Sequence, residues 1–384
     1  MKKLRVGVLF GGRSGEHEIS LLSAASVLQA LNREKYEVIP IGITKEGRWI
    51  DPAQSEKFLR GETLAAEDTS REGVAALAKD RAVISPPEPA SGTLTPFERP
   101  APAGNAGVSV DVIFPVLHGT FGEDGTIQGV LELADIPYVG AGVLGSAAGM
   151  DKDIMKRLFI ACGLPIVKHV TMLRGEWEKE PKKMVRAVEA GLKYPVFVKP
   201  ANLGSSVGIS KARDRKELAT AIDTAAGYDR KIVIEEGVGG KKHKARELEC
   251  AVLGNDSPRS SIAGEIVPAA EFYDYNAKYI DAGSELVIPA KLTKKQTKEL
   301  QEMAIRAFKA VDCSGLARVD FLMDPKNGRI YLNEINTMPG FTAISMYPKL
   351  WKATGLEYSD LIDELIRLAM ERYAEKKKNR YSKG

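Results

Sequence analysis

Three side chains towards the C-terminal end of the chain have the spacing and chemistry of a magnesium site. Asp320 lies in one apolar segment, and Glu334 and Asn336 lie two residues apart in the next. Two carboxylates and an amide oxygen, without histidine or cysteine, are hard oxygen ligands that suit Mg2+ better than Zn2+. Magnesium held by so few carboxylates completes its shell with water and nucleotide phosphates. The alternative is a solvent-exposed hairpin whose charges carry no chemistry.

A β-hairpin is the element that would bring these side chains together. Leu316–Met323 and Arg329–Ile335 are rich in strand-forming residues, and residues 324–328, DPKNG, are typical of a turn. Because side chains alternate between the two faces of a strand, we expect Arg318 and Asp320 to share a face. The same rule predicts one shared face on the second strand for Leu332, Glu334 and Asn336.

A candidate anion site follows the hairpin directly. Residues 336–340, NTMPG, end the second strand and lead towards a helix expected to begin near Ser345. The free N–H groups at a helix N-terminus can bind a carboxylate. A metal site, an arginine and an anion site in one short segment point to chemistry on phosphate.

The N-terminal segment predicts a parallel α/β unit with polar residues at its strand ends. Arg5–Leu9 has the composition of a strand, and a glycine-rich turn and an amphipathic helix follow it. Glu16 and Glu18 fit the first turn of that helix, where negative charge is stabilised, so a structural role is their alternative reading. His118 ends an apolar strand, where open α/β sheets bind ligands, or it is a structural histidine. The absence of a GxGxxG motif disfavours an NAD-dependent dehydrogenase.

A second group of candidates lies in the middle of the chain. Residues 202–208, NLGSSVG, follow a predicted strand at 195–199 and offer backbone N–H groups and hydroxyls to phosphate, unless they form a plain turn. The loop is not a Walker A motif, because no Gly-Lys-Ser/Thr occurs. A further strand at 232–238 contains Glu235 and Glu236, and strands at 247–253 and 260–267 begin a mainly antiparallel sheet. Residues 271–279 are a candidate lid.

Length and composition bound the possibilities. The 384 residues suffice for two or three domains, and the net charge of +4 is too small to indicate nucleic-acid binding. No apolar run reaches ~18 residues, and the N-terminus passes straight into a strand without a signal-peptide core. We expect Cys162, Cys250 and Cys313 to be buried free thiols, and the protein to be cytoplasmic, with no membrane or nucleic-acid partner.

Nearly the whole chain resembles ATP-grasp enzymes, and more closely the D-alanine–D-alanine ligases. Each motif is weak alone, but their order along the chain is highly specific. The matching motifs are 11–20 (GGRSGEHEIS), 117–119 (LHG), 122–129 (GEDGTIQG), 150–152 (MDK), 198–200 (VKP), 204–208 (GSSVG), 272–279 (FYDYNAKY), 318–320 (RVD) and 333–341 (NEINTMPGF).

The resemblance implies an α/β (α+β) fold of three domains with ATP bound between the second and third. We expect an N-terminal Rossmann-like parallel sheet domain at 1–145, with an insertion at about 51–107. A central ATP-grasp lid domain at 146–246 and a C-terminal ATP-grasp domain with the Mg2+ site at 247–384 complete the chain. The implied function is ATP-dependent ligation of two D-alanine molecules through a D-alanyl phosphate, for peptidoglycan precursor synthesis, by a homodimer.

The resemblance also assigns roles around ATP. Asp320, Glu334 and Asn336 match residues that hold two Mg2+ ions, with Mn2+ as a substitute. Lys152 and Lys199 match contacts to the ATP phosphates, and Lys278 matches a lid residue that reaches the transferred phosphoryl group. Positions around adenine and ribose are matched by Glu235, Glu236, Val238 and Glu247.

Further matches lie around the two D-alanine molecules. Glu16 matches the residue that receives the first ammonium group, and it joins Ser205 and Tyr279 in a network that closes the site. Arg318 and the N–H of Gly340 match donors to the oxyanion. The second substrate's carboxylate is matched by Ser345 and the N–H of Met346, and His118 matches a residue near the substrates.

Tyr279 bears on the choice of the second substrate, because similar ligases that make D-alanyl-D-lactate lack it. Asn276 departs from the family, which commonly has an acidic residue there, and this leaves the charge of the lid open. Two other classes remain as alternatives. One is an ATP-grasp enzyme for a different carboxylate, and the other is a non-catalytic nucleotide-binding protein, which would be expected to lack one of the lysine or metal positions.

Overall fold

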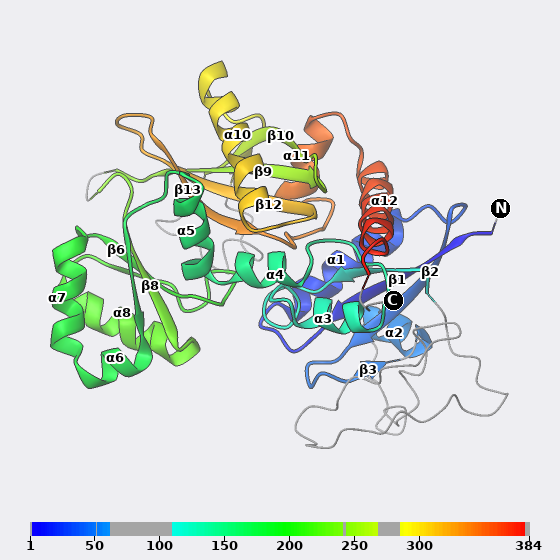
Figure 1. Ribbon diagram of the computed structural model, residues 1–384, viewed down its shortest axis with the longest axis horizontal. Helices are drawn as coiled ribbons and strands as arrows, with labels where there is room; N and C mark the ends of the chain where they lie inside the picture. The colour runs from blue at the N-terminus through cyan, green and yellow to red at the C-terminus, as the bar shows by residue number, and fades with distance from the viewer. Residues whose placement is uncertain (1, 51, 62–109, 241–242, 268–284, 381–384) are drawn as a thin grey trace.

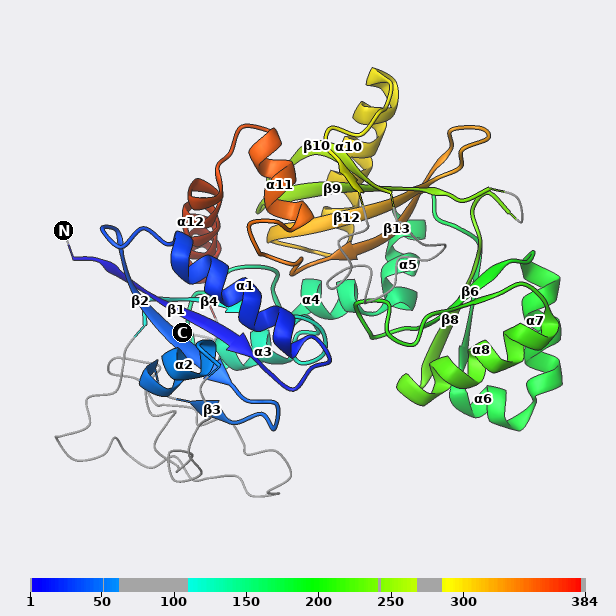
Figure 2. The same cartoon turned by 180° about the vertical axis from the view of Figure 1, so that it is seen from behind.

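The computed structural model describes residues 2–50, 52–61, 110–240, 243–267 and 285–380. These residues form three separate β-sheets, each covered by helices, and the sheets follow one another along the chain. Figures 1 and 2 show the N-terminal sheet and the central sheet at opposite ends of the molecule, with the third sheet between and above them. The fold is therefore a mixed α/β fold with the predicted parallel sheet at its N-terminus.

The N-terminal sheet has the strand order β3-β2-β1-β4. Strand β1 pairs in parallel with β2 on one side and β4 on the other, whereas the short edge strand β3 is antiparallel to β2. Apolar runs form these strands because helices cover the sheet and bury its side chains. The elements are β1 (Leu4–Gly11), α1 (His17–Ala30), β2 (Tyr36–Ile43), β3 (Trp49–Ile50), α2 (Pro52–Leu59), β4 (Val112–Val116) and α3 (Thr126–Leu133).

Helix α2 lies at the start of the expected insertion at 51–107. It packs on the sheet, since Ser55 Oγ accepts a hydrogen bond from the N–H of Gly42 at 2.7 Å and Phe58 stacks on Phe10. This helix was not predicted, because its 8 residues include few large apolar side chains and a proline-rich stretch follows them. Residues 62–109 lie outside the described part of the chain.

The central sheet is antiparallel and has the order β5-β8-β6-β7. Its apolar side chains form a separate core with those of three helices, including Trp177 and Leu218. The elements are β5 (His169–Leu173), α6 (Arg174–Lys179), α7 (Pro181–Gly191), β6 (Val196–Pro200), β7 (Ser210–Ala212), α8 (Arg215–Tyr228) and β8 (Lys231–Glu236).

The third sheet confirms the expected antiparallel arrangement, with the order β11-β10-β9-β12-β13. One face of the sheet packs on α10, and the hairpin β12–β13 forms one edge. The elements are β9 (Arg246–Gly254), β10 (Arg259–Val267), β11 (Glu285–Val287), α10 (Lys294–Ala310), β12 (Gly315–Met323), β13 (Ile330–Asn336) and α11 (Met346–Ala353).

Two short helices connect the lobes. Helix α4 (Val143–Met150) is followed at once by α5 (Lys152–Ala161), because the Asp151 side chain caps α5 by accepting from the N–H groups of Asp153 and Ile154. Both views show α5 between β13 and the central sheet. The N–H of Ile335 also donates to the Met155 sulfur, so α5 is held against β13.

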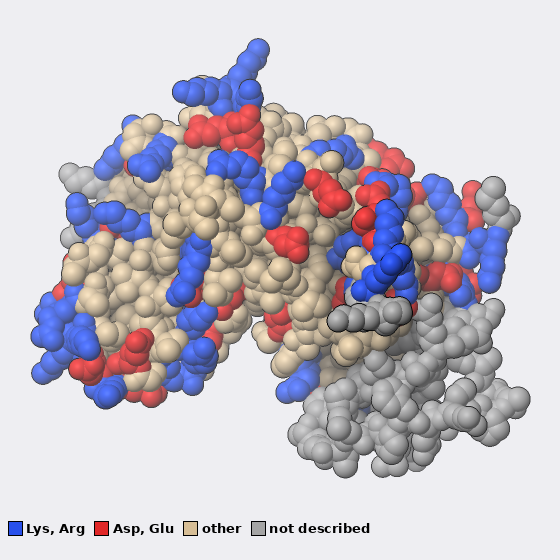
Figure 3. Space-filling model, in the orientation of Figure 1, with Lys and Arg blue, Asp and Glu red and all other residues tan. Residues whose placement is uncertain are grey.

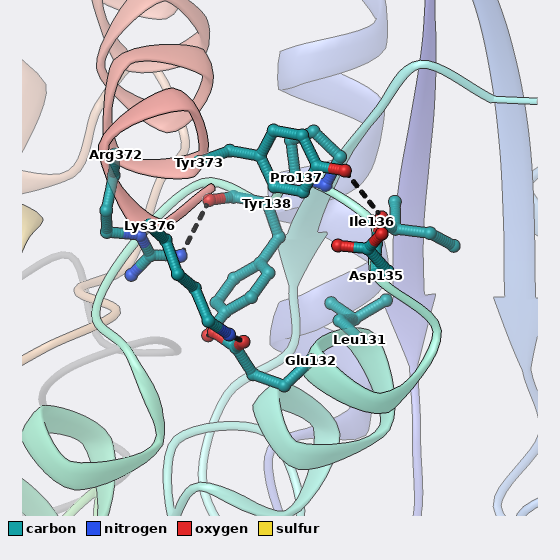
Figure 4. A pocket seen from close by; sticks show the side chains of 9 residues that line it. All are labelled: Leu131, Glu132, Asp135, Ile136, Pro137, Tyr138, Arg372, Tyr373 and Lys376. Atoms are coloured by element: carbon teal, nitrogen blue, oxygen red, sulfur yellow. Dashed lines mark hydrogen bonds and ion pairs between the residues drawn. The ribbon is translucent and has the colours of Figure 1, made fainter. Parts of the chain in front are cut away.

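The last helix, α12 (Tyr358–Lys376), returns to the N-terminal lobe. Figure 4 shows its side chains around Tyr138, with Arg372 donating to the Tyr138 carbonyl. Arg372 also donates to the Gly140 carbonyl, and its guanidinium lies 4.2 Å from the Tyr138 ring centroid. The Tyr373 hydroxyl donates to the Asp135 carbonyl at 3.1 Å. The apolar face of α12 joins residues of β1 and β4 in one core, so the C-terminal helix fixes the third sheet to the first.

The surface agrees with the modest net charge. On the face drawn in Figure 3, Lys and Arg side chains intermingle with Asp and Glu, and the surface is hollowed between the central and N-terminal lobes. In the described ranges, no helix has the length and apolar content to cross a membrane. Cys250 and Cys313 are buried free thiols as expected, but Cys162 is exposed. It follows the last turn of α5, whose buried side is already filled by Met155 and Phe159.

Candidate active site

The hairpin carries a β-bulge that the sequence pattern did not predict. Asp320 pairs with Glu334, but Phe321 pairs with Leu332, which leaves Asn333 as the extra residue. Leu332 and Ile335 therefore both face the apolar core, although an odd spacing separates them. The expectation that Leu332 shares a face with Glu334 and Asn336 is wrong.

The bulge places the polar residues of β13 on the same side as those of β12. Arg318 lies opposite Asn336 in the pairing, and Asp320 lies opposite Glu334. The face beneath them is apolar, with Val319 and Phe321 in the core. The three predicted metal ligands are thus brought together at one end of the sheet, together with the predicted oxyanion donor.

Arg318 is held by two carboxylates. Its Nε and Nη2 atoms each donate to Asp320 at 2.7 Å, and its Nε lies 3.1 Å from Glu249 Oε2. Glu249 is buried on the neighbouring strand β9, directly opposite Asp320 in the pairing. Bidentate pairing fixes the plane of a guanidinium group, so Arg318 is preorganised rather than free to swing.

The chemistry of this cluster fits Mg2+. Within the described part of the chain, no three or more His, Cys, Asp and Glu side chains form a group that could hold a metal. The hairpin instead offers two carboxylates, Asp320 and Glu334, and the amide of Asn336 on one face. Magnesium is commonly bound by one or two carboxylates with water and phosphate oxygens, so this donor set suits a metal that arrives with a nucleotide.

A lysine from the central sheet reaches this hairpin. Lys199 Nζ lies 2.7 Å from Glu235 Oε2 and 3.5 Å from Asn333 Oδ1, the amide at the bulge. Glu235 also pairs through Oε1 with Lys156 Nζ at 2.8 Å. The two sheets therefore meet at a buried group of two lysines and one glutamate.

The electrostatics of this group are strong. Burial would raise the pKa of Glu235, but the charges of Lys156 and Lys199 outweigh burial and lower the pKa of Glu235 to about 2. Burial would lower the pKa of Lys199, but the carboxylates of Glu235, Glu334 and Glu247 raise it. Lys199 is thus a fixed positive charge close to the predicted metal ligands.

The glycine-rich loop of the central sheet lies against the N-terminal lobe. Lys152 Nζ donates to the Leu203 carbonyl at 2.7 Å, which ties the loop to α5. A Cβ atom added at Gly204 would lie 2.6 Å from Oε1 of Glu16, so the Glu16 carboxylate rests on the loop backbone. Ser205, the next residue, has a positive φ of 50°. The structure therefore brings Glu16 to the loop that contains Ser205, and the network that the resemblance implies stays a prediction.

Glu16 and His118 lie at the carboxyl ends of parallel strands. Glu16 is the residue before α1 and is only 8% exposed. His118 follows β4 and forms part of the wall of a cavity of about 190 Å³, together with Gly12, Leu117 and Phe121. The site is where open α/β sheets place ligands.

His118 connects the N-terminal sheet to the segment after β13. Its Nε2 lies 3.0 Å from Ser23 Oγ and its Nδ1 lies 3.1 Å from the Met338 carbonyl. Burial would lower the pKa of His118, but the carboxylates of Glu123 and Glu16 outweigh burial and raise it. The contact to Met338 also brings the 337–341 segment next to the Glu16 region.

The helix expected near Ser345 begins there. Ser345 is the residue before α11, and its Oγ contacts Thr342 at the backbone N–H (3.1 Å) and at Oγ1 (2.7 Å). A Cβ atom added at Gly340 would lie 3.3 Å from Ser345 Oγ, so the two predicted substrate contacts are adjacent. Met346 is the first residue of α11, and its side chain is buried.

The remaining predicted site residues lie on β8 and β9, in the turn after β8, or outside the described part of the chain. Glu236 accepts a hydrogen bond from the N–H of Lys193 at 2.9 Å, and Val238 is half-buried in the turn after β8. Glu247 is half-buried on β9. Lys278, Tyr279 and Asn276 lie outside the described residues.

Several residues of this region were not predicted. Lys156, Glu249 and Asn333 contact predicted site residues directly. A signal was present for Lys156, which follows Lys152 by one helical turn and lies among apolar residues. A signal was also present for the bulge, because the apolar residues Leu332 and Ile335 break the alternation of β13.

Sequence profiles of a single family match most of the chain. The profile described as "D-ala D-ala ligase N-terminus" matches residues 5–141, and "D-ala D-ala ligase C-terminus" matches residues 158–367. A protein from Bacillus cytotoxicus named D-alanine--D-alanine ligase is 50% identical over 382 residues, which cover 100% of both chains. One of the same name from Natranaerobius thermophilus is 51% identical over 99% of this chain and 98% of its own.

Solved structures show the same fold over nearly the whole length. The D-alanine-D-alanine ligase from Coxiella burnetii superposes with a TM-score of 0.77 at 37% identity, covering 98% of this chain and 97% of that one. The VanG D-Ala:D-Ser ligase from Enterococcus faecalis gives a TM-score of 0.77 at 36% identity, covering 96% of this chain and 100% of that one.

Proposed function

The chain belongs to the D-alanine–D-alanine ligase family, which has the ATP-grasp fold, and from this premise we propose which of its residues act on each substrate. The enzyme is an ATP-dependent ligase that forms D-alanyl-D-alanine for cell wall synthesis. The roles below are those that the family resemblance implies, and the placement of the described side chains supports several of them.

The first step is phosphoryl transfer to the first D-alanine. An oxygen of its carboxylate attacks the γ-phosphorus of ATP, the bond to the bridging oxygen breaks, and ADP leaves with D-alanyl phosphate formed. Lys152 and Lys199 contact the ATP phosphates, and Lys278 reaches the transferred group. Lys199 suits this role because its neighbours keep it positively charged beside the metal strand. Glu16 receives the substrate's ammonium group, so the carboxylate points towards ATP.

The second step is acyl transfer to the second D-alanine. Its ammonium group first loses one proton to water, and the free amine attacks the carbonyl carbon of D-alanyl phosphate. The tetrahedral intermediate then releases inorganic phosphate, which takes up the second proton from the nitrogen. Arg318 and the N–H of Gly340 donate to the oxyanion, and donors fixed before the reaction stabilise such charge best. The pairing of Arg318 with Asp320 and Glu249 supports this role because it holds the guanidinium in place. Ser345 and the N–H of Met346 hold the second carboxylate.

We assign Asp320, Glu334 and Asn336 to divalent metal binding. The family implies a divalent ion with ATP, and we propose two Mg2+ ions, for which Mn2+ can substitute. When bound, these ions neutralise phosphate charge and polarise the transferred phosphoryl group. The bulge at Asn333 keeps the three proposed ligands on one face of the hairpin.

One observation carries this proposal. Lys199 of the central sheet lies 3.5 Å from the Asn333 amide, the residue directly before the predicted metal ligand Glu334. The proposed phosphate-binding lysine therefore lies beside the strand that carries the proposed metal ligands, although the two come from different sheets. This is the arrangement that a nucleotide bound between the two sheets requires.

The test is phosphate release from MgATP with different acceptors. D-alanine alone should support turnover, and L-alanine should not. Failure of D-alanine, with folded protein that still binds ATP, would contradict the assignment of the substrate. Product analysis by mass spectrometry then separates the dipeptide from any other product.

A second acceptor is suggested by the likeness to the VanG D-Ala:D-Ser ligase. D-Serine differs from D-alanine by one hydroxyl, and a pocket that fits alanine rejects such an addition only moderately. We propose D-alanine as the preferred acceptor, and equal turnover with D-alanine plus D-serine would overturn that preference. We further propose that D-lactate is rejected because Tyr279 is present.

We also propose that the enzyme is a cytoplasmic homodimer. The family resemblance is what supports the dimer, and ATP as substrate together with free thiols supports a reducing compartment. Sedimentation equilibrium at enzyme-assay concentrations tests the dimer, and a mass equal to one chain would contradict it.

A further inference from the structure

Lys156 is a buried cation for which the reaction described above has no use. Its side chain on α5 has 0% exposure, whereas a lysine normally keeps its ammonium group in water. Burying a charge is unfavourable unless it is paired and hydrogen-bonded. A buried lysine at the junction of two sheets therefore calls for a specific role.

The partners of Lys156 are the same two residues that contact Lys199. Lys156 Nζ lies 2.8 Å from Glu235 Oε1 and donates to the Asn333 backbone carbonyl at 3.2 Å. Lys199 Nζ lies 2.7 Å from Glu235 Oε2 and 3.5 Å from Asn333 Oδ1. Each acceptor residue is thus shared by both lysines through different oxygens, which is a closed arrangement of four residues.

The contact to Asn333 connects Lys156 to β13, the strand that carries the proposed metal ligands Glu334 and Asn336. Asn333 is the extra residue of the bulge, and the bulge is what places Glu334 and Asn336 on the polar face. A bulge disrupts the hydrogen-bond ladder, so its carbonyl gains from a donor outside the sheet. Lys156 supplies that donor from α5.

The contact to Glu235 connects Lys156 to the phosphate-binding lysine. With both lysines present, the Glu235 carboxylate divides its charge between two cations. Without Lys156, Glu235 would face Lys199 alone and hold it more tightly, and Lys199 would be less available to phosphate. Coulomb attraction at these distances is strong in a buried site.

We propose that Lys156 is a positioning residue that sets Lys199 and strand β13 for nucleotide binding, acting through Glu235 and Asn333. This inference rests on the proposed role of Lys199 at the ATP phosphates. Lys156 itself does not touch the nucleotide, since its side chain is fully covered. Lys152, one helical turn earlier, faces the glycine-rich loop instead.

The experiment measures binding of ADP and of adenosine, each with Mg2+, by isothermal titration calorimetry on the full chain. Lys156→Met removes the charge and keeps the length of the side chain, and Lys156→Gln also keeps a hydrogen-bond donor in case the methionine variant does not fold. We expect either variant to weaken ADP binding about tenfold and adenosine binding by less than about twofold. A merely structural role would not separate the two ligands in this way.

Two further variants make the outcomes distinguishable. Arg5→Met removes a partly buried ion pair with Asp111 at the opposite end of β1, and it should leave both affinities unchanged. Lys199→Met should weaken ADP binding at least as much as Lys156→Met does. If Lys199→Met has no effect, the proposed role of Lys199 fails; if it acts and the Lys156 variants do not, the positioning role fails. Equal losses for ADP and adenosine, or an equal loss in Arg5→Met, would also overturn the positioning role.

Discussion

Replacing Glu235 by glutamine should change the acid stability of the enzyme in a way that can be calculated. The pKa of Glu235 falls from 4.5 to about 2 because Lys156 and Lys199 outweigh burial. At about 1.4 kcal/mol for each pH unit, this corresponds to about 3 kcal/mol of folding free energy. A lowered carboxyl pKa stabilises the fold above the unfolded value and loses that contribution as the pH falls through the folded value. The window therefore runs from about pH 4.5 down to about pH 2.

The free energy of unfolding of Glu235→Gln should differ most from that of the wild type at neutral pH. Glu235→Gln leaves Lys156 and Lys199 without their shared carboxylate, and breaking such a buried pair costs about 3–5 kcal/mol. As the pH falls, the wild type loses the extra stability that ionised Glu235 provides. With the two pKa values above, about 2 kcal/mol of the difference should vanish between about pH 7 and about pH 3.

The assay is urea unfolding of the nucleotide-free enzyme, followed by tryptophan fluorescence. The chain has three tryptophans, and Trp177 is the one in the central lobe that carries Glu235. Trp49→Phe and Trp351→Phe in both proteins make the signal report this lobe alone, which keeps the analysis of one transition valid. Glu236→Gln, the neighbouring residue on β8, controls for the loss of a carboxylate and should destabilise far less.

A constant free-energy difference between wild type and Glu235→Gln across this pH range would refute the reasoning. It would mean that Glu235 is not held ionised by the two lysines. A difference that grows as the pH falls would have the wrong sign and would point to a carboxyl group that is protonated in the folded enzyme.

Three other predictions concern the reaction. Glu334→Gln should lose most Mg2+-dependent activity while its circular dichroism and urea midpoint remain those of the wild type, and a fully active variant would remove Glu334 from the metal site. Gly204→Ala places a Cβ atom 2.6 Å from Glu16 Oε1, and because this carboxylate is the far end of a flexible side chain it should move without unfolding the protein. We expect the KM for the first D-alanine to rise about tenfold. Gly175→Ala is the control, because a Cβ atom there has no neighbour within 4 Å. Equal KM values for Gly204→Ala and the wild type would contradict the placement of Glu16. Tyr279→Phe should slow turnover and admit D-lactate as acceptor, measured as ester product by mass spectrometry; unchanged kinetics with both acceptors would show that Tyr279 does not select the nucleophile.

Much of the site could be predicted because its signals are local. The hairpin around residues 324–328, the strand end at His118 and the helix start at Ser345 each depend on a few neighbouring residues. Turn chemistry and apolar runs act over such short distances, so they can be read from the sequence. The order of the family motifs then added roles that no single segment could supply.

The face of Leu332 shows where local rules fail. Strict alternation predicted that this residue shares a face with Glu334. In the structure Leu332 and Ile335 both pack into the core, and the bulge in β13 makes this possible. Packing against α5 and α10 outweighs the regular ladder at this point. The prediction that Cys162 is buried was wrong for a related reason, because its exposure depends on which side of α5 packs against the core.

The parallel α/β unit at the N-terminus, the hairpin with its hard oxygen ligands and the loop of small residues could be predicted from sequence alone, because they follow from interactions between near neighbours. Tertiary packing alone places Lys156 and Lys199 on Glu235, Glu16 against Gly204, and His118 next to the Met338 carbonyl. These contacts join segments far apart in the chain, and they exist only once three separately formed sheets have packed together. Their electrostatic consequences depend on burial, which no short stretch of sequence specifies.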